Sequence, residues 1–234
     1  MKELLDSRNQ NLWNEIQEKY NVEFSDSHNE EYGCFTQNNN VTFYIDQNNL
    51  CKDSFTHEML HVYLKLKETY IGASLELTIK GNKTLSSIMS SQLIDHMGNC
   101  LDHVKMLPIY LELNFDREKF LLDYNEYKCT RDELAMLKKY YKNGSTVNLQ
   151  AVDAYIGRLV SIFADPNDTF DYSRDLNELK KIDLLLYQII ERLFTHWKEV
   201  KIEDRKVFED DYHTVTFNFH ENMKKWISHN RIRV

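Results

Sequence analysis

Residues 54–66, SFTHEMLHVYLKL, carry His57, Glu58 and His61 in the spacing H-E-x-x-H. In an α-helix, residues four positions apart lie one turn above each other, so both imidazoles can face a single ion. Imidazole nitrogen is a preferred zinc ligand, and zinc lowers the pKa of a bound water toward about 7. Glu58 lies about 100° further round the helix, where its carboxylate can take a proton from that water. The spacing therefore predicts a hydrolytic zinc centre with Glu58 as general base.

A hydrolytic zinc site needs a third protein ligand, and SQLIDHMGNCLDHVKML (91–107) offers several. A helix over 84–106 gathers metal-capable or hydrogen-bonding side chains into one stripe. His103 is the predicted third ligand. Asp102 is the runner-up and could also accept a hydrogen bond that orients a ligand histidine. The stripe as a whole comprises Asp95, His96, Asn99, Asp102 and His103, of which His96 is the next choice and Asn99 also remains open.

Residues 41–66 and 95–103 together resemble the zincin superfamily of metallopeptidases, and in architecture the small bacterial intracellular zincins. The resemblance covers the front half of the chain only. It implies that His57 and His61 are ligands and that Glu58 is the general base. It also implies that VTFYID (41–46) is an edge strand that aligns a peptide by strand addition.

The chain departs from the two best-defined zincin patterns. No glycine and third histidine follow at metzincin spacing in HEMLHVYLKLKETY. The thermolysin-like group takes a glutamate from its second helix, and residues 84–106 contain none. The origin of the third ligand therefore stays open among the residues of the 95–103 stripe.

The elements that must hold these residues are mainly helices. Six glycines and two prolines in 234 residues favour long helices over many tight turns. Three β-prone runs, 22–24, 32–37 and 41–46, precede the motif helix, and the last two are expected to form a hairpin. The predicted fold class is α+β, predominantly α-helical, with a small antiparallel sheet packed against the H-E-x-x-H helix and a helical C-terminal half.

Local signals set the expected bounds of the remaining elements. Asp53 or Ser54 is expected to cap a motif helix that runs to about Lys67, and Pro108 to stop the next long helix. SLELTIK (74–80) alternates apolar and polar residues and is predicted to be a strand. Helical periodicity or capping signals mark 4–20, 84–106, 116–126, 130–142, 148–163, 173–200 and 217–230. We divide the chain into a zincin-like catalytic region, 1–127, and a helical region, 128–234, within one domain or two.

Composition narrows the classes of function. A net charge of −8 argues against a nucleic-acid-binding protein, and no run approaches the roughly 20 apolar residues that cross a bilayer. The segment MKELLDSRNQ lacks the apolar core of a secretory signal. The four cysteines, which form no C-x-x-C pair, are expected to be reduced thiols. These are Cys34, Cys51, Cys100 and Cys129. A cytoplasmic location is expected.

Three functions are compatible with this pattern. The first is a zinc-dependent peptidase that acts on a narrow set of intracellular protein substrates. The second is a scaffold in which zinc ties two helices together and is enclosed by four protein ligands. The third is a helical interaction module that binds no metal. The setting of the motif, after a hairpin and on an amphipathic helix, favours the peptidase.

Overall fold

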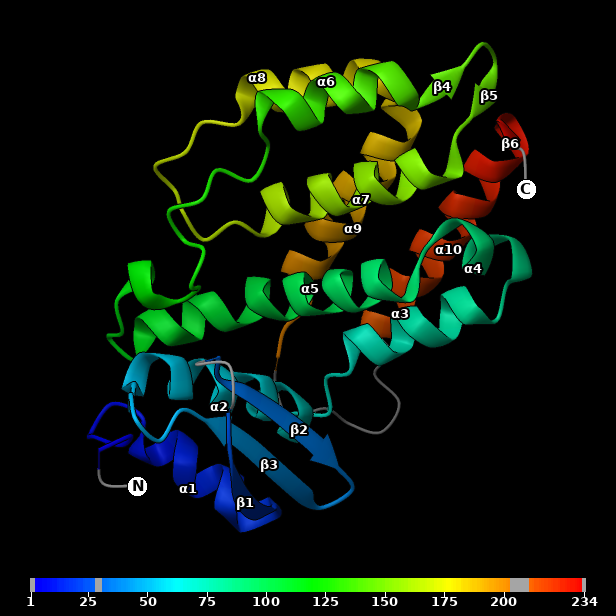
Figure 1. The fold of residues 1–234 in the computed structure, drawn as a ribbon. Coiled ribbons are helices and arrows are strands. Elements are labelled where there is room, and N and C mark those ends of the chain that lie inside the picture. The colour runs from blue at the N-terminus through cyan, green and yellow to red at the C-terminus, as the bar shows by residue number, and fades with distance from the viewer. Residues whose placement is uncertain (1–2, 28–30, 203–210, 233–234) are drawn as a thin grey trace. The chain divides into compact units, whose positions relative to one another are not determined.

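The computed structural model describes residues 3–27, 31–202 and 211–232. Helices follow one another along most of the chain, and the strands form two small sheets (Figure 1). The predicted fold class, a predominantly helical α+β protein, is confirmed.

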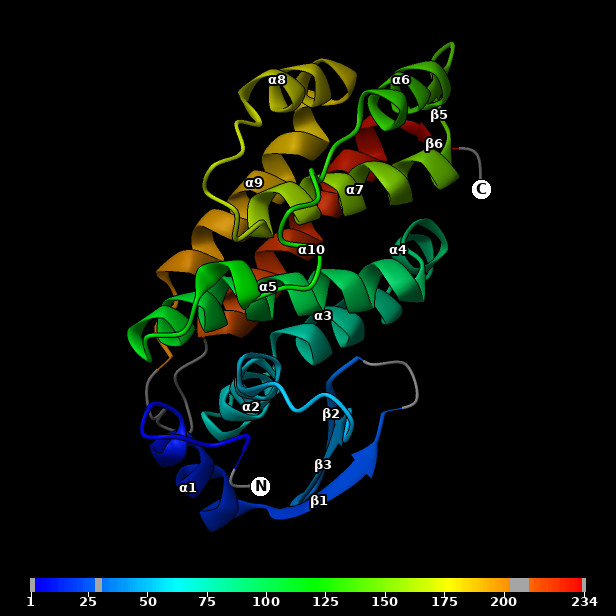
Figure 2. The same ribbon diagram turned by 60° about the vertical axis from the view of Figure 1, so that its left-hand side comes forward.

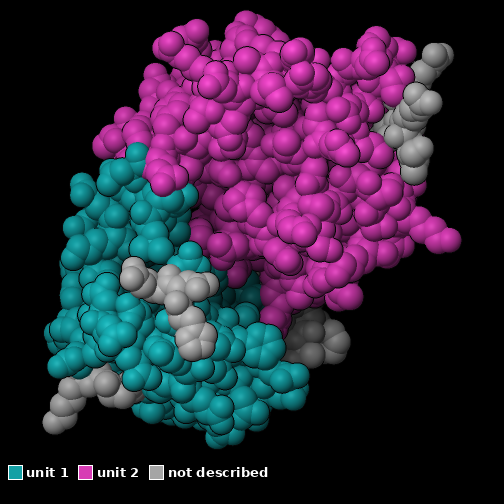
Figure 3. Space-filling model, in the orientation of Figure 1, with its two compact units in different colours: residues 1–69, 105–125, 202–206 teal, residues 70–104, 126–201, 207–234 magenta. Residues whose placement is uncertain are grey.

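The chain folds into two compact units, coloured separately in Figure 3. Unit 1 consists of residues 1–69, 105–125 and 202–206, and unit 2 of residues 70–104, 126–201 and 207–234. The division expected from the sequence shares the boundary near residue 126. Residues 70–104, however, pack with the second unit, because their apolar side chains join its helical core.

The sheet of unit 1 has the strand order β1-β3-β2, formed by β1 (Asn21–Asp26), β2 (Gly33–Gln37) and β3 (Asn40–Ile45). The β2–β3 hairpin is antiparallel as predicted, but β1 pairs with β3 in parallel. The sheet is therefore mixed, not antiparallel. The prediction that 41–46 is an edge strand is also wrong, because β3 lies between β1 and β2 and pairs with both.

One face of this sheet is covered by α1 (Gln10–Lys19) and α2 (Lys52–Leu66) (Figure 2). The contact is aromatic: the ring centroid of Trp13 lies 6.2 Å from that of Phe43 on β3 and 5.7 Å from that of Phe55 on α2. Each large aromatic ring buries enough apolar area to contribute on the order of 2 kcal/mol. These rings fix the helix that carries the motif on the sheet.

The start of α2 differs from the prediction. Cys51 is the N-cap residue and makes no side-chain cap, so neither Asp53 nor Ser54 caps the helix. Asp53 lies in the first turn, where the helix dipole favours a carboxylate. Its carboxylate is engaged by Tyr110 and Lys119 instead.

The predicted helix 84–106 is two helices, α4 (Lys83–Ile88) and α5 (Ser91–Glu112). Pro108 does not end α5, and the helix continues for four more residues. Loss of one backbone hydrogen bond at a proline costs roughly 3 kcal/mol. Burial of Met106 and Tyr110 in the core of unit 1 offsets this cost.

Two glycines let α5 approach α3 (Ile71–Lys80) closely. A Cβ on Gly98 would lie only 3.0 Å from the Cα of Gly72. A side chain at Gly98 would therefore require a shift of one helix, whereas a Cβ on Gly72 would lie 3.4 Å from the Cα of Gly98. This contact fixes the N-terminal part of α5 within unit 2.

Several other bounds depart from expectation. Residues 74–80 belong to the helix α3, because Ile71, Leu75 and Ile79 are buried at helical spacing. Asp183 interrupts the predicted 173–200 helix, and 116–126 contains only a short 3-10 turn. The Thr130 capping box is confirmed.

The remaining elements are η1 (Arg117–Lys119), α6 (Arg131–Tyr140), β4 (Lys142–Asn143), β5 (Thr146–Val147), α7 (Leu149–Ala164), α8 (Ser173–Ile182), α9 (Leu184–Glu199), α10 (Asp211–His229) and β6 (Arg231–Ile232).

Asp183 joins the helices of unit 2. Its buried carboxylate caps α9 by accepting the Leu186 amide at 2.9 Å. The Tyr141 hydroxyl and the Trp226 indole N–H donate to its other oxygen, both at 2.9 Å. One carboxylate thus satisfies donors from three helical segments.

In the part of the chain that the structure describes, none of the helices has both the length and the apolar character needed to cross a membrane.

Asp183→Ala should lower the free energy of unfolding by about 4 kcal/mol, because two buried donors and one helix N-terminus lose their acceptor. Urea unfolding measures this change. Asp171→Ala removes an exposed carboxylate that accepts the Ser173 amide at 2.9 Å, and it should leave the urea midpoint close to that of the wild type. Equal midpoints for the two variants would contradict a role for Asp183 in joining the helices.

Candidate metal centre

Three histidines converge although the third lies 42 positions after the second in the sequence. His57 and His61 come from α2 and His103 from α5. One ring nitrogen from each lies within 4.8 Å of the others. His57 and His103 are buried and His61 is half-buried. This is the one group of three or more metal-capable side chains among the described residues.

The geometry of the group suits a tetrahedral ion. Zinc–nitrogen bonds of 2.0–2.1 Å put the nitrogens of a bound set about 3.4 Å apart. The three nitrogens lie within 4.8 Å of one another, so binding one ion would draw them closer together. The donor set, three imidazoles, fits zinc and leaves a fourth position for water.

His57 lies in an apolar setting. Its ring centroid is 4.8 Å from that of Phe120, and it forms a hydrogen bond with the Phe120 backbone. Burial and then the nearby His61 lower its pKa to about 3, against the opposing effect of that hydrogen bond. The ring is therefore neutral at pH 7, the form that binds a metal.

The Glu58 carboxylate contacts the sheet and also lies near His61. Burial raises the pKa of its carboxyl, while His61 and a hydrogen bond with the Cys34 side chain act in the opposite direction. Cys34 lies on β2, which packs against α2. The predicted general base therefore contacts an edge strand of the sheet.

The other candidates on α5 have different positions. Asp95, His96 and Asn99 are exposed, and His96 bonds the Ser161 hydroxyl at 3.0 Å. Asp102 is half-buried and does not belong to the histidine group. Of the sequence stripe, only His103 joins His57 and His61. Its role as third ligand remains a prediction that the geometry favours.

Tyr110 is fully buried on α5. Its hydroxyl donates to Asp53 Oδ1 at 3.3 Å, and burial followed by the charge of Asp53 raises its pKa. This hydroxyl is committed within the protein.

Comparisons of the chain with protein-family models, curated proteins and solved structures found no match.

His103→Ala should weaken zinc binding on the order of 100-fold, since one of three ligands to an ion bound by roughly 10 kcal/mol is lost. Competition with a chromophoric chelator, on protein made without a histidine tag, measures the affinity. His96→Ala on the same helix should bind zinc like the wild type. Equal losses in both variants would show that the α5 ligand has been misassigned.

Proposed function

We propose that the protein is a zinc-dependent peptidase that hydrolyses peptide bonds of a narrow set of protein substrates. The observation that carries this proposal is the convergence of His103 with the two histidines of an H-E-x-x-H helix. The three imidazoles would hold the metal. A zinc ion bound in this way polarises a carbonyl and lowers the pKa of water to about 7.

Glu58 is the general base in this proposal. Its carboxylate takes a proton from water and then delivers that proton to the leaving amine. The raised pKa of its carboxyl brings the base closer to neutrality, where such a transfer works best. Cys34 holds the carboxylate from the side of the sheet.

The peptide would add to the edge of β2. The earlier expectation for 41–46 fails because β3 is central, whereas β2 lies at an edge of the sheet. An extended peptide there would pair with the outward backbone groups of Gly33–Gln37. Cys34 on this strand contacts Glu58, so the edge lies beside the base.

A scaffold with a structural zinc is the alternative. Structural zinc sites are closed by four protein ligands. The histidine group in the described residues has three members, and the nearby Asp102 is not one of them. Three donors favour catalysis over a structural role.

We further propose that the protein acts in the cytoplasm. All four cysteines are free thiols, as expected in a reducing compartment.

Glu58→Gln should retain zinc and lose peptidase activity by at least about 100-fold, because the amide cannot accept the proton. Mass spectrometry of a peptide library incubated with the zinc-loaded protein detects the cleavages. Glu112→Gln, an exposed substitution at the end of α5, is the matched control and should cleave normally. Cleavages that persist unchanged in Glu58→Gln would rule out this base.

A further inference from the structure

We infer that Tyr110, together with Asp53 and Phe120, is a positioning residue for the metal centre: it holds the Phe120 segment on His57 and sets the register of α5 against α2. This inference rests on the metal binding in the proposed function. It assigns a role to residues that are not themselves ligands.

Phe120 forms the immediate surroundings of His57. Its ring packs on the imidazole, and its backbone forms a hydrogen bond with the same side chain. Such a partner fixes which nitrogen carries the proton and how the ring is turned. Phe120 follows η1, a turn of only three residues, so contacts elsewhere must hold it in place.

Tyr110 supplies the first of those contacts. Its ring lies edge-on to Phe120, with centroids 5.1 Å apart, and both residues are buried. The ring centroid of Phe115 is also 5.1 Å from that of Tyr110. These three residues therefore form one aromatic cluster at the C-terminal end of α5.

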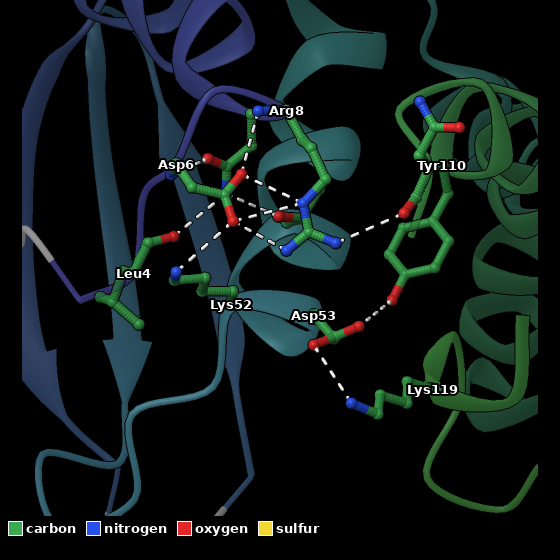
Figure 4. Close-up of polar contacts among 10 residues, drawn as sticks. Leu4, Asp6, Arg8, Lys52, Asp53, Tyr110 and Lys119 are labelled. Carbon is green, nitrogen blue, oxygen red and sulfur yellow. Dashed lines mark hydrogen bonds and ion pairs between the residues drawn. The ribbon is translucent and has the colours of Figure 1, made fainter. Parts of the chain in front are cut away.

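Asp53 supplies the second contact. Its Oδ1 accepts the Tyr110 hydroxyl at 3.3 Å, and its Oδ2 lies 3.8 Å from Lys119 Nζ (Figure 4). Lys119 directly precedes Phe120, and Asp53 lies one helical turn before His57. The contacts therefore form a closed ring that begins and ends on α2.

The same bond sets the position of α5 along α2. Tyr110 follows His103 by seven residues, which returns it to within about 20° of the same helix face. Asp53, His57 and His61 follow one another at four-residue steps along α2. The pairing of Asp53 with Tyr110, and of the histidines with His103, means that the two helical segments run in opposite directions.

Tyr110→Phe removes the hydroxyl alone and should weaken zinc binding about 10-fold, the lower end for partners outside the ligand shell. The absorption spectrum of the Co²⁺-substituted protein should change as well. Asp53→Asn keeps an acceptor for Tyr110 but loses the charge that attracts Lys119. It should weaken zinc binding less, and it provides a second test if Tyr110→Phe does not fold.

Tyr155→Phe is the matched control. Tyr155 is also fully buried, and its hydroxyl donates to the carbonyls of Leu179 and Asp183 in unit 2. This variant should lose stability but keep the zinc affinity and the Co²⁺ spectrum of the wild type. A Tyr110→Phe variant with the same pattern would overturn the inference and leave Tyr110 a core residue only.

The wild-type protein separates this inference from the proposed function. Zinc binding without peptidase activity would refute the peptidase and leave the positioning role open to the Tyr110→Phe test. A wild-type protein that binds no zinc would overturn both.

Discussion

The burial of His57 and His103 is the constraint on which the site depends. Polar groups removed from water without compensation cost roughly 1–3 kcal/mol each. Burial, and then the neighbouring His61, lowers the pKa of His57 and so disfavours its charged form. The free energy that it costs to bury two imidazoles side by side must be offset by favourable packing elsewhere in the fold. Under the proposed function, a cation bound to the neutral imidazoles would recover this energy at the site itself, so that metal binding would stabilise the fold.

Unit 1 supplies the packing on two sides of α2. Trp13, Phe43 and Phe55 fasten the helix to the sheet, whereas Tyr110, Phe115 and Phe120 fasten it to the end of α5. Aromatic rings suit this task because each buries a large area with few rotatable bonds. The polar side chains on α2 therefore have little conformational freedom, because packing on two sides fixes the helix that carries them. The hydrogen bond between Tyr110 and Asp53 adds a directional contact to this aromatic packing, which is itself non-directional.

Local spacing was sufficient to predict part of the site. The positions of His57 and His61 follow from helix periodicity alone, and the same rule grouped His103 with its neighbours on α5. Periodicity could not show which end of that stripe faces α2, and the exposed Asp95 and His96 were indistinguishable from His103. Phe120 and Lys119 carry no sequence signal, because the contacts of Phe120 with His57 and of Lys119 with Asp53 join residues more than 60 positions apart. The errors at SLELTIK and Pro108 have one cause: tertiary burial outweighed a local propensity.

Neighbouring residues of α2 have different partners. The histidines face α5, while Glu58, one residue along, turns toward β2 and meets Cys34. A single helix therefore joins a metal-capable group to the edge of a sheet through adjacent residues. Under the proposed function, this arrangement brings the base between the ion and a peptide paired with β2. A structural zinc site would have no need for a carboxyl at that half-buried position, since removal from water raises its pKa and disfavours the charged form. The cost of removing part of the Glu58 carboxyl from water is therefore more easily understood in a hydrolase than in a scaffold.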